Sequence, residues 1–504
     1  MPLFLLYLGL GLLVLLPVIA VRIPPLVDYP NHLARCYILH NLAHDAVLQR
    51  YYRNVMAAQP NLALDLVIPF LNRFFSIWTA GRIFIGLTML SLVSGCALLH
   101  RALHGRFSAW PALAFLFVYN RLLLWGFLGY LFGLGVALAA AAGWVALQRR
   151  PWGVRLGFGL VTTTVIYLLH LYALGIYTVL IGGFELADGI SRRRSANERA
   201  GRVLVTALAF APSVWLFLFV SPTSAAAGQF VWGSVTRKLT EPFKLVVAYQ
   251  PRANVAALVL VVVVALVLLA RGRVRIVRAA VPGLIGLAVL LLTMPNELFS
   301  SFGADRRIPI AFALVAIAVT GWGDASAGLR RGVMLGAGLL LFLQVGAITR
   351  AWAQSQAVYR SYIAALNHLP EGAQLLAAVP GTVPGFPPLY HVDAYAVILR
   401  DAFLPSLFAA PEDAGSSIAF TPPFEALRRR TPGVVIWPAT LARLRNPAYA
   451  RRKGPFRAGL IADYDAALVI DPQMIPRWAR LSGNCVVIAR PDGGVLLRLP
   501  CAPP

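Results

Sequence analysis

Long uninterrupted apolar blocks constrain this chain more than any other feature of its sequence. They recur through the first 350 residues and run for about 15 to 25 residues, a length that crosses a hydrocarbon core at the helical rise of about 1.5 Å per residue. A globular core requires no such runs. The composition agrees, because 59% of the residues are hydrophobic and 13% are charged, with a mean hydropathy of +0.71. The sequence therefore predicts a polytopic α-helical membrane protein.

The blocks predict eleven membrane-spanning helices. They are expected near residues 2–21, 83–100, 109–121, 123–147, 155–170, 172–190, 203–220, 254–270, 280–295, 308–322 and 332–349. The first block is interpreted as a retained helix rather than a signal peptide. No basic residue precedes it, and no small-residue cleavage site stands before Arg22.

Arginine-rich connections predict the orientation of these helices. The short segments HRALHGR, QRRPWGVR, SRRRSANERAGR, RGRVRIVR and GLRR carry most of the basic residues of the first 350 positions, and such clusters collect on the cytoplasmic side. The net charge of +25 is therefore interpreted as a topology signal rather than as nucleic-acid binding. Residues 22–82, 221–253, 296–307 and 351–504 are then expected outside the cytoplasm. Arginine outnumbers lysine by 42 to three, which together with the Ala and Leu content indicates a GC-rich bacterial genome. The chain is therefore expected in the inner (plasma) membrane, with a periplasmic C-terminal domain.

The chain is expected to divide into a membrane module over 1–350 and a soluble α/β domain over 351–504. The module also contains one long non-spanning loop, residues 22–82. Within the module, loop 22–82 contains two amphipathic stretches that are predicted to lie in the membrane interface. The alternative is a small helical domain away from lipid. After Arg350, short apolar runs alternate with Pro-rich turns and helical stretches, as in a small α/β domain.

A predicted hairpin near the C-terminus carries two cysteines. Cys485 and Cys501 flank the sequence around the turn Asp492–Gly494, which would bring their strand positions opposite each other. A disulfide at this position would fit an oxidising compartment. The alternative is a pair of free thiols.

The segment RIPPLVDYPNHLAR after the first span carries the candidate catalytic residues. Its prolines end one helix and start another, with Asp28 at the new N-terminus. Asp28, His32 and Arg35 follow at i, i+4 and i+7, so they share one helical face. Such a face can accept a proton from a hydroxyl and orient a phosphate. The alternative is that Asp28 only caps the helix and the other two are solvated.

This layout resembles the GT-C superfamily of membrane glycosyltransferases. The resemblance rests on the first span, the early acidic residue Asp28 in a loop with two amphipathic helices, the arginine-rich cytoplasmic turns, and the C-terminal α/β domain. It implies a polyprenyl-phosphate sugar donor and a carboxylate base. Family members often carry a paired-acid motif in this loop, whereas this chain has one acid followed by Tyr-Pro-Asn-His. A bound divalent metal is therefore not predicted, and no cofactor is expected.

Cations in the predicted external loops are the candidate partners of the donor phosphate. Arg306 and Arg307 stand before one span, and Lys244 and Arg252 stand before another, against the trend that places basic residues inside. Arginine binds phosphate well through its two-pronged donor geometry. The alternative is that these side chains extend toward lipid headgroups. His170, at a predicted external turn, is a candidate for an acceptor cavity, or else a histidine satisfied by backbone carbonyls.

These observations favour transfer of a sugar from a polyprenyl-phosphate donor to an extracytoplasmic glycan, lipid or protein, with inversion and with Asp28 as general base. This interpretation expects Asp28, His32 and Arg306 to converge on one cavity. The alternatives are a transporter or lipid flippase with an accessory domain, or a non-catalytic scaffold. Transport is disfavoured because the spans carry almost no charged residues and no repeat relates two halves of the chain.

Overall fold

The computed structural model describes residues 2–191, 195–222, 230–246, 251–299, 301–379, 387–409, 416–431, 460–470 and 486–499. Cys485 and Cys501 lie outside the described residues. Internal contacts divide the chain into two compact units. Unit 1 comprises Met1–Ala20, Ala57–Leu64 and Arg82–Arg350, and unit 2 comprises Val21–Met56, Asp65–Gly81 and Ala351–Pro504.

Seven helices in the described part of the chain are long and apolar enough to cross a membrane. They are α1 (Pro2–Ala20), α5 (Ile77–His104), α7 (Leu128–Ala146), α8 (Trp152–Leu169), α9 (Leu171–Ser191), α13 (Pro251–Ala270) and α16 (Ala327–Leu366). An eighth span is possible if α10 (Ala196–Ala209) and α11 (Ala211–Phe219), which meet at a 40° bend, are counted as one. The protein is a membrane protein, as the sequence predicted.

The other three predicted spans form shorter elements. Block 109–121 folds as a 3-10 helix, η1 (Trp110–Phe117), followed by the short helix α6 (Arg121–Trp125). Asn120 separates the two, because its side chain accepts a hydrogen bond from the backbone N–H of Leu123 and so caps α6. Blocks 280–295 and 308–322 contain α14 (Val281–Thr293) and α15 (Ile308–Val319). At 13 and 12 residues, these helices are shorter than a full span of about 20 residues.

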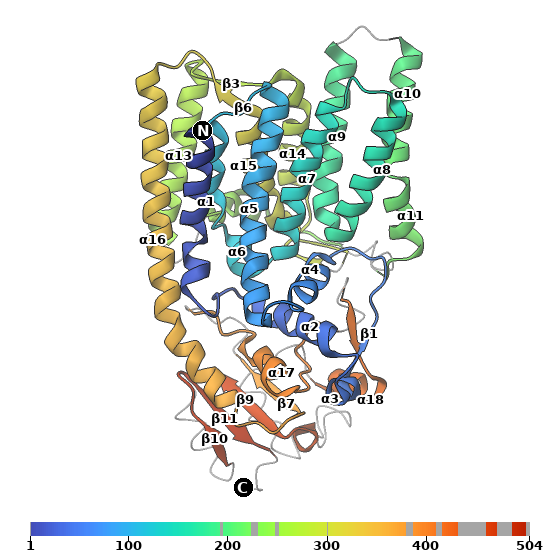
Figure 1. The fold of residues 1–504 in the computed structure, drawn as a ribbon, viewed down its shortest axis with the longest axis vertical. Helices are drawn as coiled ribbons and strands as arrows, with labels where there is room; N and C mark the ends of the chain where they lie inside the picture. Colours follow the sequence, from blue (N-terminus) through green and yellow to red (C-terminus); the bar gives the residue numbers. More distant parts are fainter. Residues whose placement is uncertain are drawn as a thin grey trace. The chain divides into compact units, whose positions relative to one another are not determined.

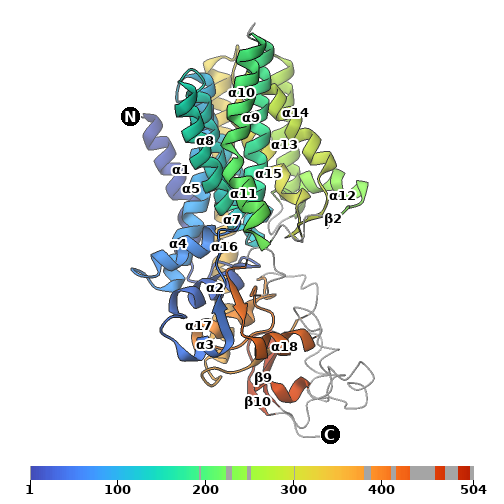
Figure 2. The same ribbon diagram turned by 90° about the vertical axis from the view of Figure 1, so that its right-hand side faces the viewer.

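Helix α9 is central to the packing of unit 1. It packs against α7, α8 and α14, and Figures 1 and 2 show α8, α9 and α10 side by side. Its contact with α14 depends on two glycines, because a Cβ on Gly183 would overlap the backbone of Gly283. Small residues of this kind let membrane helices approach closely.

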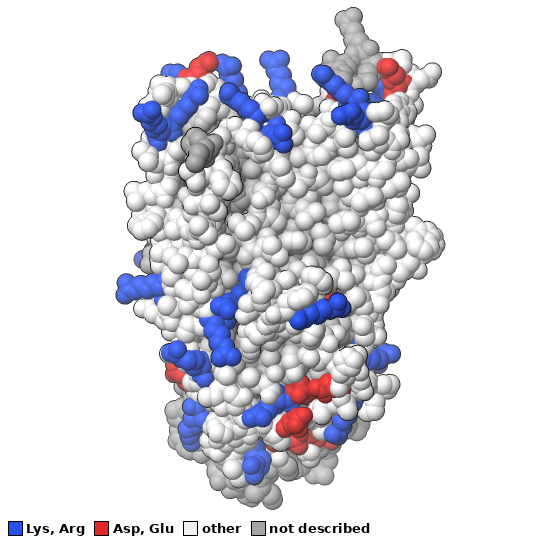
Figure 3. Space-filling view, in the orientation of Figure 1, with Lys and Arg blue, Asp and Glu red and all other residues white. Residues whose placement is uncertain are grey.

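Two small sheets join the connections between the helices of unit 1. Strands β3 (Val274–Ile276) and β6 (Thr320–Trp322) pair antiparallel, which brings two of the arginine-rich connections together. A second sheet has the strand order β2-β4-β5, from Phe230–Val231, Glu297–Leu298 and Ser301–Phe302, and joins two loops that were predicted to be external. On the face drawn in Figure 3, basic side chains gather at one end of these helices and a wide belt beyond them carries uncharged residues. This is the surface expected of helices immersed in lipid.

Unit 2 combines part of the first loop with the C-terminal segment. Its four-stranded sheet has the order β10-β11-β9-β7, with β7 and β9 parallel and the other pairs antiparallel. These strands are β7 (Leu375–Ala378), β9 (Ala466–Ile470), β10 (Val487–Ala489) and β11 (Gly494–Arg498), the last two forming the predicted hairpin. Strand β1 (Tyr52–Asn54) pairs with β8 (Ile418–Phe420), which joins the loop to the C-terminal segment. The α/β character predicted for this segment is therefore present.

The two amphipathic stretches of the first loop have different environments. Helix α2 (Tyr29–Asn41) packs against η6 (Val392–Ala394) and α17 (Tyr395–Arg400), so most of its first half is buried in protein. Helix α4 (Ala63–Leu71) exposes Leu66 and Phe70. The interfacial prediction therefore suits α4, whereas α2 belongs to the core of unit 2.

Candidate functional site

Asp28 occupies the N-cap position of α2, but its side chain makes no capping hydrogen bond. Its backbone lies in the αR region, with φ −88° and ψ −6°, rather than in the extended region from which an N-cap side chain normally reaches the helix. The carboxylate is 21% exposed, and its Oδ1 lies 3.7 Å from Nε2 of His391. The simple capping alternative is therefore not what the structure has.

A buried polar network surrounds this pair. The side chain of Asn31 accepts a hydrogen bond from the backbone N–H of Phe408 at 2.7 Å and donates to the carbonyl of Ser406 at 3.0 Å. Its amide nitrogen also lies 3.3 Å from Nδ1 of His391. The hydroxyl of Ser406 donates to Asp393 at 2.6 Å. All four side chains, including that of His391, are buried in unit 2, so the network holds the environment of Asp28 in one arrangement.

His32 and Arg35 have different partners in the structure. The ring of His32 packs edge-on against Phe408, and burial lowers its pKa well below the ordinary value, followed by the effects of Arg35 and His391. Arg35 forms a buried ion pair with Asp65, at 2.8 Å between Nη2 and Oδ1. Asp65 also accepts a hydrogen bond from the hydroxyl of Ser417. Asp28 and His32 thus lie beside the His391–Phe408 cluster, whereas Arg35 anchors α2 to Asp65.

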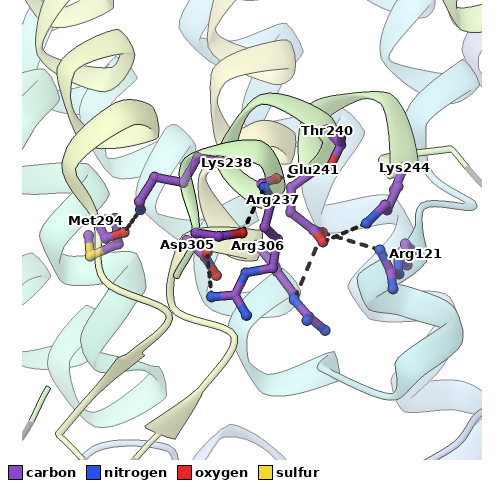
Figure 4. Close-up of polar contacts among 10 residues, drawn as sticks. Arg121, Arg237, Lys238, Thr240, Glu241, Lys244, Met294, Asp305 and Arg306 are labelled. Carbon is purple, nitrogen blue, oxygen red and sulfur yellow. Dashed lines mark hydrogen bonds and ion pairs between the residues drawn. The ribbon is translucent and has the colours of Figure 1, made fainter. Parts of the chain in front are cut away.

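A second set of charged side chains lies in unit 1, around the buried carboxylate of Glu241 (Figure 4). Arg121, Lys244 and Arg306 approach this carboxylate, with nitrogen–oxygen distances of 3.2, 3.0 and 3.8 Å. They come from α6, from η3 (Glu241–Lys244) and from η5 (Asp305–Arg307). Loops that are far apart in the sequence therefore place their cations around one acid.

Asp305 extends the same cluster. Its Oδ2 lies 3.6 Å from the guanidinium of Arg237, and the neighbouring Lys238 donates to the carbonyl of Met294. Both basic residues belong to α12 (Val235–Thr240). We call Arg121, Arg237, Lys238, Lys244 and Arg306, with Glu241 and Asp305, the cation cluster. Among the described residues it has five cations and two carboxylates, so it carries an excess of positive charge.

The two consecutive arginines of η5 differ in their surroundings. Arg306 stacks over the rings of Trp125 and Phe302, each 4.6 Å from the guanidinium carbon. Arg307 is buried, donates to the carbonyl of Phe302 at 2.9 Å, and lies over the rings of Phe127 and Tyr172. Arg306 therefore belongs to the cation cluster, whereas Arg307 stabilises the turn between Phe302 and η5.

His170 is buried at the C-terminal end of α8. Its Nδ1 accepts a hydrogen bond from the backbone N–H of Tyr172 at 3.2 Å, and its ring packs edge-on against Tyr130. Tyr130 and Tyr172 also contact Arg307, so His170 and Arg307 share neighbours. Arg252 is exposed on the first turn of α13, and no ion pair joins it to the cation cluster within the described residues.

No protein-family model matches this sequence, and no curated protein matches it. Two solved structures match its fold: ArnT from Cupriavidus metallidurans bound to undecaprenyl phosphate, and the same protein in the apo state. Each is 12% identical to this chain, and the matches cover 98% of this chain and 97% of ArnT, with TM-scores of 0.56 and 0.57. The chain has the GT-C fold. At this identity the likeness is one of fold over nearly the full length.

Several residues that form these sites were not singled out from the sequence. Asn31 and His391 are 360 positions apart, and Arg121 and Glu241 are 120 apart, so no local pattern connects them. A usable signal existed only for Glu241, which is an acid within the basic segment TRKLTEPFK. The described residues contain no group of three or more His, Cys, Asp or Glu side chains that could hold a metal ion.

Proposed function

We propose that this protein is a membrane glycosyltransferase that uses a polyprenyl-phosphate sugar as donor. The observation that carries the proposal is the cation cluster, which concentrates positive charge around two carboxylates in a chain with the GT-C fold. ArnT, which shares that fold, has been solved with undecaprenyl phosphate bound. A lipid phosphate is the type of anion that such a cluster suits.

The donor phosphate is assigned to Arg306 and Lys244, with Arg121 beside them. These three cations already hold an anionic group, the carboxylate of Glu241. A phosphate entering the cluster competes with that carboxylate and then receives charge-assisted hydrogen bonds. The same cations stabilise the negative charge that grows on the phosphate as it leaves the sugar. Arg307 stabilises the turn that carries Arg306. The exposed side chain of Arg252 is proposed to attract the anionic lipid.

Asp28 is assigned as the general base. The acceptor hydroxyl attacks the anomeric carbon, its proton passes to the Asp28 carboxylate, and the bond from that carbon to the phosphate oxygen breaks. The electron pair of the broken bond remains on the polyprenyl phosphate, and the configuration at the anomeric carbon inverts. His32 borders this site, while Arg35 acts through its ion pair with Asp65 by holding α2 in place.

The acceptor is a glycan, lipid or protein outside the cytoplasm, and His170 is assigned to its cavity. The proposed location is the bacterial inner membrane, with residues 351–504 on the extracytoplasmic side. The excess of arginine in the predicted cytoplasmic connections supports this orientation.

The test is release of lipid phosphate by the purified protein from a panel of polyprenyl-phosphate sugars. Asp28→Asn is expected to lower the rate by about 10²- to 10⁴-fold, the usual contribution of a general base, without changing protein abundance. Asp324→Asn, at an exposed ion pair, is the matched control and should retain the wild-type rate. Wild-type activity in Asp28→Asn would overturn the assignment. Movement of intact donor across a vesicle membrane without phosphate release would instead favour a transporter.

A further inference from the structure

Asn31 fixes the position of a proton that lies close to Asp28. A backbone N–H can only donate, so the side-chain atom that faces the N–H of Phe408 at 2.7 Å must be the amide oxygen of Asn31. The amide nitrogen is then the atom that donates to the carbonyl of Ser406 at 3.0 Å. The orientation of this amide therefore follows from its backbone partners alone.

The same amide determines the tautomer of His391. The side-chain nitrogen of Asn31 can only donate a hydrogen bond, so Nδ1 of His391, 3.3 Å away, must accept it with its lone pair. A neutral imidazole has one N–H, and it is then on Nε2. Nε2 is the atom that lies 3.7 Å from Oδ1 of Asp28. The ring thus directs its single N–H at the carboxylate.

Burial also favours the neutral form of this ring. His391 is buried between the rings of Tyr390 and Phe408, and burial lowers its pKa to about 3. The titratable groups around it are Asp28 and His32 on the α2 side and Tyr390 and Asp393 on its own segment. A neutral donor orients a carboxylate without lowering its basicity as much as a cation would.

We propose that His391 is a positioning residue for the base, donating from neutral Nε2–H to Oδ1 of Asp28, and that Asn31 sets the required tautomer. This role rests on the proposed function of Asp28. The present separation of 3.7 Å is longer than a formed hydrogen bond of about 2.7–3.2 Å, and catalytic contacts often close only when substrate binds. The hydrogen bond fixes the carboxylate so that its remaining lone pairs meet the acceptor hydroxyl.

The activity test compares His391→Gln with His391→Asn. The amide nitrogen of Gln can reach the position of Nε2 and donate to Asp28, whereas the shorter Asn reaches only the position of Nδ1. His391→Gln should keep a kcat within about threefold of the wild-type value. His391→Asn should lose about 10- to 100-fold in kcat with little change in KM, because the mispositioned base then supplies only part of its usual contribution to the rate. His44→Asn, at an exposed histidine, is the control.

The pH profile separates positioning from mere packing. A donor to the ionised carboxylate favours that form, so its loss raises the pKa of Asp28. The acid limb of kcat/KM should therefore move to higher pH in His391→Asn and stay in place in His391→Gln. Burial raises the pKa of Asp393 to about 6, so Asp393→Asn is measured alongside to identify any contribution from that group.

A third measurement does not depend on activity. Nitrogen NMR of protein carrying ¹⁵N-labelled histidine distinguishes the two neutral tautomers, and His391→Gln identifies the signal among the eight histidines. The expected result is a protonated Nε2 and an unprotonated Nδ1. A protonated Nδ1, or a wild-type kcat and pH profile in His391→Asn, would overturn the role of His391. If either result overturns the role of His391 but Asp28→Asn is inactive, the proposed function still stands. Full activity in Asp28→Asn overturns the assignment of Asp28 as base and, with it, the role of His391.

Discussion

Unit 1 contains two clusters of charged side chains that differ in their balance of charge. The first is centred on Glu185 of α9, which accepts from Arg155 at 2.6 Å, from Arg202 at 2.8 Å and from the indole N–H of Trp144 at 2.9 Å. Asp188 adds a second carboxylate, 3.5 Å from Arg202. Two cations therefore face two carboxylates within the described residues, and all of them are buried or nearly so.

The cation cluster around Glu241 and Asp305 has the opposite character. Its five cations exceed its two carboxylates, and they include partly exposed side chains such as Lys244, which is 40% exposed. Burying charge is costly unless it is paired, so a balanced cluster is suited to joining helices. An unbalanced cluster that solvent reaches is suited to binding an anion. The contrast indicates a structural role for the cluster around Glu185 and a ligand-binding role for the cation cluster.

Removing the central acid of the balanced cluster should have the largest effect, and it should be on stability. Glu185→Gln leaves Arg155 and Arg202 with only Asp188, and breaking a buried pair costs about 3–5 kcal/mol. Thermal unfolding of the purified protein in detergent measures the loss. The control is Asp324→Asn, whose ion pair with Arg275 is exposed and should contribute less than about 1 kcal/mol. A variant that unfolds like wild type but no longer transfers sugar would contradict the structural assignment.

Removing a cation from the unbalanced cluster should affect ligand binding instead. Arg306→Ala deletes a guanidinium that stacks on Trp125 and Phe302 and is assigned to the phosphate. A charge-assisted hydrogen bond is worth about 1.5–3 kcal/mol, so the affinity for polyprenyl phosphate should fall by about 10- to 100-fold. Inhibition of transfer by added polyprenyl phosphate measures this affinity. Arg271→Ala, at an exposed arginine of another connection, should leave it unchanged.

Removing the acid of the unbalanced cluster should act in the opposite direction. Glu241→Gln abolishes the carboxylate that competes for Arg121, Lys244 and Arg306, so phosphate affinity should rise by about 3- to 10-fold, or about 1 kcal/mol. The unliganded variant should be less stable, because its cations lose their counter-charge, and polyprenyl phosphate should stabilise it more than it stabilises wild type. Thermal unfolding with and without the lipid tests both points. A weaker affinity would mean that Glu241 orients the cations rather than competing for them.

The smallest effect is expected at Lys244. Its ammonium is 40% exposed, so water weakens its attraction to a bound phosphate, and such exposed ion pairs contribute less than about 1 kcal/mol. Lys244→Ala should therefore change the donor KM by less than about threefold. A loss equal to that of Arg306→Ala would show that charge, rather than the stacked guanidinium geometry, determines phosphate binding.

Parts of the candidate sites were predictable because they depend on local sequence. Asp28 follows two prolines and precedes Tyr29 and Pro30, so the start of α2 at this point was expected. The sequence also selected Arg306 and Lys244, since both are cations in predicted external loops. It did not select Glu241, whose carboxylate both cations approach. The one signal was an acid within the basic segment TRKLTEPFK, and that signal does not show that Arg306 lies nearby.

The sequence alone determined that this chain lies in a membrane, because apolar runs of this length have no other favourable solvent. It also determined where the first helix ends and which connections are rich in arginine. Tertiary structure decided that α2 packs with the C-terminal segment, where Asn31 meets His391 and Ser406. It likewise decided that Arg35 pairs with Asp65. Hydropathy and helical spacing are properties of neighbouring residues, whereas a hydrogen-bond partner 360 positions away is chosen only when the folded chain brings donor and acceptor within reach.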